Sequence, residues 1–417
     1  MHINKIAFFL LILSIGLFYL SCKDRPSYSN EPKDNIGGGV KNNNLIDSYS
    51  DSLFDERFNR EIATQNANTK SLRDSVYPEV VFNEPSIKSI NIKDLGAMGD
   101  GVNDDSDIFL QALKKARDSK MPLYVPEGNY LINKEIAFEG GDFILYFSDS
   151  AILFTNSKIP NLLKLSNADK LTISGGTFSA KNLTSGLILI RNIKNVNLKK
   201  ISLIGKSDNI KYGIRVTESR FTSIIDCKSK DVTEGSTGSV FSLTASESVE
   251  IIDCFVENAY TAYNSFLNRK TKISGNTAVN CSDNGVYNQQ ENNVGIIEGN
   301  YFKNCVEGIV TTSPNTQILN NTIDNSSNTA INYRKSHNII VKNNTFNNNY
   351  TDIRGAKDVN HLKIEIVDNK IYKTHGNVSI QILNGINCLI ERNEILTKNG
   401  KNVIFLAQQN FFFLKIL

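Results

Sequence analysis

A short pattern of apolar and polar positions recurs along the second half of the chain. Each copy starts with an apolar residue, an Asn follows three positions later, and the copy usually ends on a second apolar residue. Apolar and polar residues alternate within each copy, and a period of two indicates strands. Successive copies lie about 24 residues apart, which suits one turn of a solenoid and is too short for two packed helices. The recurring Asn is found at Asn276, Asn300, Asn321, Asn344, Asn369 and Asn393.

Looser copies come earlier, and in them the position of the Asn is held by Gly176, Ile201, Cys227 and Cys254. One coil cannot bury its own apolar face, so the coils must stack to form a continuous core. We therefore expect an all-β protein, a parallel β-helix solenoid of about ten coils. Equivalent residues of successive coils would lie about 4.8 Å apart, so the Asn residues would form a ladder of stacked amides. Asn also tolerates the left-handed backbone of a sharp bend, which would place it at a corner.

Four of the six cysteines follow the same period. Cys227 and Cys254 share the ladder position, whereas Cys281 and Cys305 each follow a ladder Asn by five residues. This periodic placement predicts small buried side chains that stack on their equivalents, and it argues against a disulfide framework or a metal site. No His beyond position 2 has a metal-ligand spacing with Cys, Asp or Glu, so we expect no zinc site.

Residues 90–132 depart from the coil pattern. Closely spaced glycines permit a tight loop, and Asp105 or Ser106 can cap the helix that we expect over 108–116. That helix has one apolar face, and residues 123–132 then have the pattern of a strand, a turn and a second strand.

The block from Asp94 to Ile132 resembles the N-terminal signature of the pectate-lyase-like superfamily of right-handed parallel β-helices. That superfamily includes polygalacturonase-related and rhamnogalacturonase-like proteins and phage tailspikes. The resemblance implies a right-handed β-helix over residues 86–417, with a short N-terminal helix that caps the open end of the stack. Its acidic loop lacks the full spacing of a calcium loop, so we interpret the loop as part of the cap.

The N-terminal residues 1–22 have the pattern of a secretory signal peptide, with a basic start and a short apolar run. The run is too short for a comfortable membrane span. The sequence Tyr-Leu-Ser before Cys22 resembles a bacterial lipobox, which predicts lipidation of Cys22; an ordinary signal peptide is the alternative. Residues 23–85 are rich in Pro, Gly and Asn and form a predicted flexible tether. We expect a cell-envelope protein, as an outer-membrane or cell-surface lipoprotein, and otherwise a periplasmic or secreted one.

The net charge of +3 gives no indication of a nucleic-acid partner. A polysaccharide is favoured instead by the residue that follows the inward apolar position on one strand of each coil. Arg can hold a carboxylate through two hydrogen bonds, so a stripe of Arg, Tyr and Asn favours an acidic polysaccharide; a solvated polar face is the alternative. The predicted outer column is Arg215, Phe241, Asn264, Tyr287, Asn332 and Arg354, with Thr217, Gln289 and Arg334 two residues further on.

Three functions compete for this stripe. A glycoside hydrolase needs two carboxylates on one face, and we find no clear pair on that strand. The Asn-Thr-Asp, Asp-Asp, Gly-His-Gly and Arg-Ile-Lys motifs of polygalacturonase-type relatives are also missing from the coils. A polysaccharide lyase instead neutralises a uronate carboxylate and removes the neighbouring proton. The third function is non-catalytic: a surface glycan-binding or adhesive β-helix lipoprotein.

We expect an enzyme that acts on extracellular polysaccharide, lyase-like or hydrolase-like, with the binding protein as the alternative. The resemblance leaves calcium open as a cofactor, because calcium neutralises the substrate carboxylate in many β-helix lyases and Arg or Lys does so in others. No metal ligands are assigned, and no oligomeric state follows from the sequence. The catalytic candidates are Arg334, Tyr333, Arg354 and Arg215, and the substrate-binding candidates are Tyr287, Gln289, Asn332, Asn264 and His337.

Overall fold

A computed structural model describes residues 88–397, apart from short gaps, and the backbone of two further strands at 404–407 and 411–416. The gaps are residues 181–182, 184, 206–209, 234, 236, 290–293, 356–360 and 374–377. The predicted signal peptide with Cys22 and the predicted tether at 23–85 lie outside the described residues.

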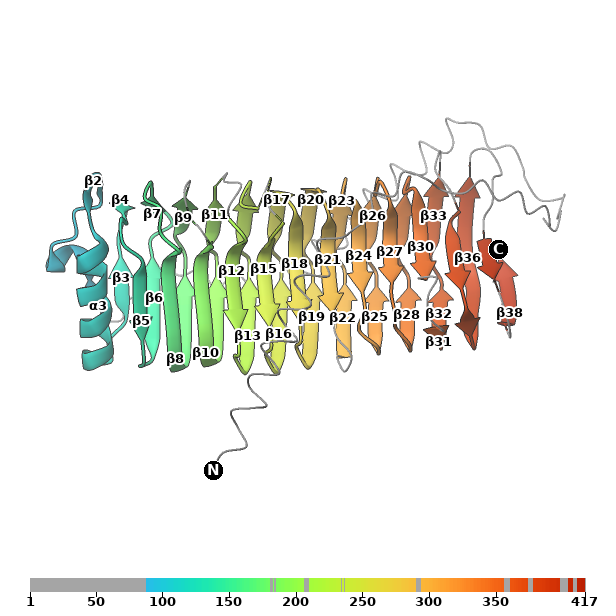
Figure 1. Cartoon of the computed structure of the whole chain (residues 1–417), viewed down its shortest axis with the longest axis horizontal. Helices are drawn as coiled ribbons and strands as arrows, with labels where there is room; N and C mark the ends of the chain where they lie inside the picture. The colour runs from blue at the N-terminus through green and yellow to red at the C-terminus, as the bar shows by residue number, and fades with distance from the viewer. Residues whose placement is uncertain are drawn as a thin grey trace, which may run out of the picture. The chain divides into compact units, whose positions relative to one another are not determined.

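The described part is a parallel β-helix in which three strands complete most coils, and each strand pairs with its equivalents in the coils before and after (Figure 1). The stack has about 11 turns, close to the ten predicted. The first strands of the coils form the first sheet, made of β5 (Ile136–Glu139), β8 (Asn161–Ser174), β10 (Gly186–Lys199), β12 (Tyr212–Thr217), β15 (Ser239–Thr244), β18 (Thr261–Phe266), β21 (Asn284–Gln289), β24 (Glu307–Thr311), β27 (Thr329–Tyr333), β30 (Thr351–Gly355), β34 (Ile380–Leu383) and β37 (Ile404–Ala407).

The second sheet contains β1 (Ile90–Asn91), β3 (Leu123–Val125), β6 (Phe143–Phe147), the later parts of β8 and β10, β13 (Phe221–Ile225), β16 (Ser248–Ile252), β19 (Lys270–Ser274), β22 (Val294–Glu298), β25 (Thr316–Leu319), β28 (Ile339–Lys342), β32 (Ile364–Val367), β36 (Cys388–Thr397) and β38 (Phe411–Ile416). The third sheet contains β2 (Asp100–Asp104), β4 (Gly128–Leu131), β7 (Ala151–Thr155), β9 (Thr177–Ala180), β11 (Ser202–Ile204), β14 (Lys228–Lys230), β17 (Phe255–Ala259), β20 (Thr277–Cys281), β23 (Tyr301–Lys303), β26 (Thr322–Asp324), β29 (Thr345–Asn347), β33 (Lys370–Lys373) and the end of β36. Two short strands, β31 (His361–Leu362) and β35 (Gly385–Ile386), pair with each other in the turns between the first and second sheets.

The helix α3 (Ser106–Ser119) lies at the N-terminal end of the stack (Figure 1). The 3-10 helix η1 (Ile92–Leu95) precedes it in the chain. α3 buries Phe109 and Leu113 against the first coils, as predicted for a cap. Asp105 stands at the N-cap position, but its side chain does not cap the helix. Its carboxylate accepts hydrogen bonds from the backbone N–H groups of Met98 at 2.8 Å and Gly99 at 3.0 Å, so it fixes the preceding loop instead.

The Asn ladder is confirmed, and it satisfies its own hydrogen bonds. The Oδ1 of Asn321, for example, accepts from the backbone N–H of Asn300 at 3.0 Å and from the Asn300 Nδ2 at 2.9 Å. The Nδ2 of Asn321 donates to Asn344 Oδ1 at 3.0 Å and to the carbonyl of Ile297 at 2.9 Å. The same contacts repeat from Asn276 to Asn393, so each amide ties neighbouring coils together.

The left-handed residue of the corner is the one before the ladder Asn, which corrects the prediction that the Asn itself adopts this conformation. The side chain of the Asn points inward, and the residue before it turns the chain. These turning residues have φ between 52° and 68°, and they are Gly275, Gly299, Asn320, Asn343, Asp368 and Arg392.

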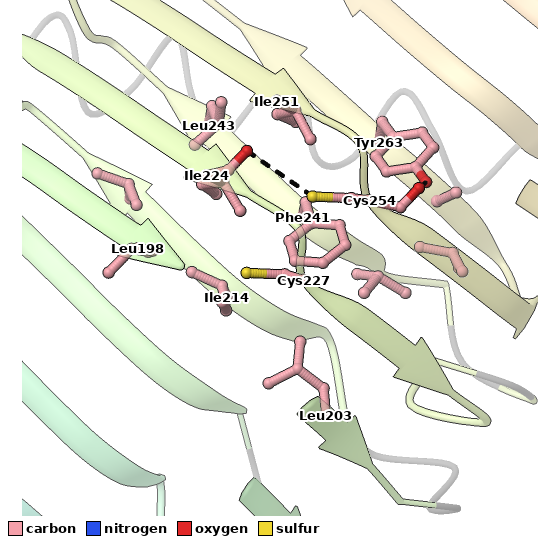
Figure 2. Packing of buried hydrophobic residues seen from close by; sticks show 14 of the residues in the cluster. Leu198, Leu203, Ile214, Ile224, Cys227, Phe241, Leu243, Ile251, Cys254 and Tyr263 are labelled. Atoms are coloured by element: carbon pink, nitrogen blue, oxygen red, sulfur yellow. Dashed lines mark hydrogen bonds between the residues drawn. The ribbon is translucent and has the colours of Figure 1, made fainter. Parts of the chain in front are cut away.

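The cysteines take the places that the period predicts. Figure 2 shows Cys227 and Cys254 among the buried apolar side chains, and all five described cysteines are buried and free. The Cys254 thiol donates to the carbonyls of Ile252 at 3.3 Å and Ile224 at 3.7 Å, and burial raises its pKa well above the usual value. Sulfur therefore replaces the amide at the start of the ladder.

Candidate functional site

The first sheet presents one outward column of polar side chains that runs along the stack. In register, Arg215 pairs with Ser242, Ser242 with Asn264, and the column continues coil by coil. Most of the predicted outer column is therefore confirmed in its placement. The outer column of the first sheet is Leu189, Arg215, Ser242, Asn264, Tyr287, Val310, Asn332, Arg354 and Gln381.

Phe241 does not belong to this column, so its predicted outward position is wrong. It pairs in register with Ile214 and Tyr263, which point into the core, and its ring stacks on Tyr263 with centroids 5.8 Å apart (Figure 2). A one-residue change of register moves a side chain to the opposite face of a strand, and Ser242 holds the outward place instead.

Three residues of the next coil gather around the carboxylate of Glu307, a residue that the sequence pattern did not predict. Its side chain is only 5% exposed. Its Oε1 accepts from Asn332 Nδ2 at 2.7 Å and from Asn328 Nδ2 at 3.2 Å, and its Oε2 accepts from Arg334 Nη2 at 2.6 Å. The Nη1 of Arg354 donates to Asn328 Oδ1 at 3.3 Å, which joins a second guanidinium to the group. We call Glu307, Asn328, Asn332, Arg334 and Arg354 the Glu307 cluster.

Glu307 could have been recognised by comparing it with the residues that pair with it in the neighbouring coils. It stands opposite Asn284 in the coil before and Thr329 in the coil after, and Thr351 follows one coil later. An acid at a position where the neighbouring coils carry Asn or Thr is unusual only once the coils are aligned on this strand.

Glu307 holds Arg334 in place without hiding it. The guanidinium makes a short charge-assisted contact to the buried carboxylate, while 34% of the Arg334 side chain stays exposed. Guanidinium carries five N–H donors, and the ion pair with Glu307 engages only one nitrogen. The remaining donors are thus available to an anionic group that approaches the first sheet.

Tyr333 lies in the core and not on this face, which contradicts an outward catalytic role. It is fully buried, its ring contacts the edge of His361 at a centroid distance of 4.8 Å, and burial raises its pKa well above the usual value. A side chain at Gly355 would lie 2.6 Å from the Tyr333 hydroxyl, so the glycine leaves room for the ring. The strand alternates, and the residue after outward Asn332 must point inward.

The other candidates lie on or near the outer column. Arg215 sits with its guanidinium 5.8 Å from the ring of Tyr212. Asn264, Tyr287 and Gln289 are half-buried and outward-facing on β18 and β21. His337 is exposed in the turn between β27 and β28, beyond the Glu307 cluster.

The outer column is an extended surface and not one compact pocket. Arg215 and Arg354 are six register steps apart, which at about 4.8 Å per step is roughly 29 Å. A small molecule cannot contact both, but a polymer can. In the described part of the chain, no group of three or more His, Cys, Asp and Glu side chains converges as metal ligands would.

The strand that carries Arg354 is anchored by a buried ion pair. Asp352 is fully buried, Lys373 is 4% exposed, and Lys373 Nζ lies 2.9 Å from Asp352 Oδ2. Lys373 also donates to the carbonyls of Asn349 at 2.8 Å and Tyr350 at 3.1 Å. Burial raises the pKa of Asp352 to about 6, against the lowering effect of Lys373.

The model of the family "Rhamnogalacturonase A/epimerase, pectate lyase-like" matches residues 89–310. The chain belongs to this family. A model of the right-handed β-helix region matches residues 262–411, and the right hand agrees with the implied one. None of the described helices is long and apolar enough to cross a membrane.

Two relatives match parts of the chain. It is 35% identical over 122 residues to a glucan 1,3-beta-glucosidase of Cochliobolus carbonum, a match that covers 25% of this chain and 14% of that protein. It is 25% identical over 174 residues to plasmin and fibronectin-binding protein A of Streptococcus pneumoniae (strain ATCC BAA-255 / R6), which covers 34% and 24%. The chain thus matches less than a quarter of the length of either relative.

Solved structures share the fold at low identity. The surface adhesin PfbA of Streptococcus pneumoniae superposes with a TM-score of 0.55 at 15% identity, covering 75% of this chain and 91% of the adhesin. A family 28 exopolygalacturonase of Yersinia enterocolitica gives a TM-score of 0.58 at 12% identity, covering 77% of each chain. The same β-helix therefore serves an adhesin and a carbohydrate-active enzyme, and the chemistry has to be argued from side chains.

Proposed function

We propose that the protein binds an acidic polysaccharide along the outer column of the first sheet. The observation that supports this is the 2.6 Å contact by which buried Glu307 orients half-exposed Arg334. A pre-oriented guanidinium loses little conformational freedom when it pairs with a carboxylate, and its planar fork matches that group. Arg354 and Arg215 provide further positive charge along the same column.

The balance of charge in the Glu307 cluster favours a uronate over a neutral sugar. The cluster holds two guanidinium groups and one carboxylate, and both oxygens of that carboxylate already accept hydrogen bonds from the protein. An incoming carboxylate therefore meets the exposed part of the Arg334 guanidinium, and the one carboxylate of the cluster is buried. Binding should weaken as salt is added, because exposed charges are screened.

Eliminative cleavage of the same polymer is the second candidate. A lyase needs a cation that stabilises the charge developing beside the uronate carboxylate, and Arg334 is placed to do this. Because Tyr333 lies in the core, Tyr287 is the tyrosine of the outer column that remains as a base. Hydrolysis is less well supported, since it needs two carboxylates at the reacting bond and the cluster offers only the fully engaged Glu307.

We further propose that residues 1–22 are a signal peptide, that Cys22 carries a lipid, and that residues 23–85 tether the β-helix to the membrane at the cell envelope. The apolar run and the lipobox-like sequence support this. Metabolic labelling with a fatty acid and cell fractionation check it: Cys22→Ser should lose the label and leave the membrane fraction. A variant that stays membrane-bound and is processed normally would remove the anchor from the proposal.

The binding test uses the full-length protein with polygalacturonate, alginate and rhamnogalacturonan, and with a neutral glucan as the reference polymer. We expect Arg334→Ala to weaken binding of one acidic polymer at least about tenfold, the value of one charge-assisted hydrogen bond. Lys335→Ala is the matched control, because Lys335 is the adjacent exposed cation, outside the cluster. Equal affinities of Arg334→Ala, Arg354→Ala and the unmodified protein would refute the site.

Ultraviolet absorbance of unsaturated products and a reducing-end assay run in the same samples separate the two candidates. Unsaturated products that disappear in Arg334→Ala and Tyr287→Phe would establish the lyase. Binding without product formation on any acidic polymer would leave the protein as a glycan-binding β-helix.

A further inference from the structure

A second candidate site lies at the turns between the first and second sheets, where an open groove spans the coils of β10, β12, β15 and β18. The groove encloses about 540 Å³, which is within the range of small-molecule sites. Each turn places its middle residue inward and its two flanking residues outward. The inward residues Ser219, Ser246 and Asn268 are buried, and the Ser246 N–H donates to Asn268 Oδ1 at 2.9 Å. Hydrogen bonds between successive turns therefore hold the floor of the groove in register.

The outward residues on either side of the groove include both acidic and basic side chains, and ion pairs hold several of these side chains in place. Arg220 Nε lies 2.8 Å from Glu247 Oε2, and Arg191 Nη2 lies 3.1 Å from Glu218 Oε1. Arg269 forms no ion pair with any other residue that the structure describes. Carboxylates accept and guanidinium groups donate hydrogen bonds, and a sugar hydroxyl does both. Neighbouring hydroxyls on one ring thus match a groove in which donors and acceptors alternate.

One side of the groove also contains two apolar residues with a strained backbone, Ala245 and Leu267. Ala245 and Leu267 have left-handed backbones with φ of 50° and 58°, and the Leu267 side chain is 43% exposed. The equivalent positions of earlier coils hold Asn167, Asn192 and Glu218, and of these residue types Asn tolerates the conformation best. Ala and Leu tolerate this conformation less well than Asn does. Leu267 offers an apolar surface for the C–H face of a sugar ring.

We propose that this groove binds a neutral pyranose unit, with Arg220, Glu247 and Arg269 bonding its hydroxyls and Leu267 packing on its ring. The charges that line the groove nearly balance, because Glu218 and Glu247 face it together with Lys194, Arg220 and Arg269, so a ligand does not need a charge of its own. The site is separate from the outer column and does not rest on its proposed function. A polymer with acidic and neutral sugars would contact both.

Saturation-transfer NMR on the full-length protein tests the groove with methyl glycosides of neutral hexoses and deoxyhexoses, and with methyl galacturonoside. We expect at least one neutral glycoside to bind, and Glu247→Gln and Arg269→Ala to weaken it about tenfold. Asp368→Asn is the matched control. It breaks the exposed ion pair of Asp368 with Arg392 at 2.6 Å, outside the groove, and should leave binding unchanged.

Leu267→Asn separates binding from folding. Asn is favoured in the left-handed conformation, so this variant should unfold at a higher denaturant concentration than the unmodified protein and yet bind the glycoside more weakly. No saturation transfer to any neutral glycoside would overturn the proposal, as would equal binding by Glu247→Gln, Arg269→Ala and Leu267→Asn. Binding of the acidic glycoside alone, lost in Arg334→Ala, would overturn the groove and support the outer column.

Discussion

The Asn ladder and the outer column of the first sheet are both columns of equivalent side chains, but they differ in how much the residue varies from coil to coil. The Asn ladder has the same residue in coil after coil, and each side-chain amide forms hydrogen bonds with the neighbouring coils. The outer column of the first sheet changes residue at almost every coil, and Arg334 beside it keeps donors directed outward. In a solenoid, uniformity marks the residues that hold coils together, and variation marks the surface that is free to bind.

The interior near the outer column is an exception to this distinction, because the Asp352–Lys373 ion pair is buried where most other side chains are apolar. Lys373→Met should lower the free energy of unfolding by about 3–5 kcal/mol, since it leaves the Asp352 carboxylate buried without its partner. Denaturant unfolding measures this. The double variant Asp352→Asn/Lys373→Met should recover most of the loss, and an equal loss in the double variant would contradict the pairing.

The same pair should make stability depend on pH. The pKa of Asp352 is about 6 in the folded protein, against an ordinary aspartate value of 3.8, so the folded state binds more protons between these values. The contribution of this group to stability is therefore present below about pH 4 and decreases as pH rises towards 6. Unfolding midpoints between pH 4 and 7 test this, and Asp352→Asn should flatten the profile.

The ladder predicts the next largest effect. Asn321→Ala should destabilise the protein by about 2–3 kcal/mol, because the carbonyl of Ile297 and the N–H of Asn300 lose their buried partners. Gln317→Ala on the outward face of β25 serves as the comparison and should change stability by less than about 0.5 kcal/mol. Similar losses in both variants would remove the distinction between the two kinds of column.

Glu307→Gln tests whether the Glu307 carboxylate orients Arg334 beside the outer column. Gln keeps the shape but loses the charge that orients Arg334, so affinity for an acidic polymer should fall about threefold to tenfold. Isothermal titration measures it against the Arg334→Ala protein. Tighter binding in Glu307→Gln would mean that the carboxylate repels the ligand and that the assignment of its role is wrong.

Arg215→Ala should have the smallest effect and depend on the length of the ligand. Arg215 lies roughly 29 Å along the column from Arg354, so only a long chain can contact both. We expect about a threefold loss for the polymer and no change for a short oligosaccharide. A loss for the short ligand would place the main site near Arg215 and away from the Glu307 cluster.

The repeat alone was enough to predict the coils, the ladder and the stacked cysteines, because all three depend on spacing between equivalent residues. The same spacing placed Arg215, Asn264, Tyr287, Asn332 and Arg354 in one column. It failed by one position at Phe241, because Val240 and Phe241 are successive apolar residues that are both buried, and the pattern alone does not show which of them precedes the outward residue. The predicted outward position of Tyr333 was wrong for a related reason. Its neighbour Asn332 faces outward, and side chains alternate along a strand, so the Tyr333 ring points into the core.

Only the tertiary structure could identify Glu307, the Asp352–Lys373 pair and the groove at the turns. Each depends on side chains from different coils that meet across more than 20 residues of sequence, as the contact between Glu307 and Arg334 does at a separation of 27. A repeating pattern determines which residues share a column, since backbone pairing fixes the register. Which side chains reach across columns is decided by their length, rotamer and burial, and those follow from packing of the complete stack.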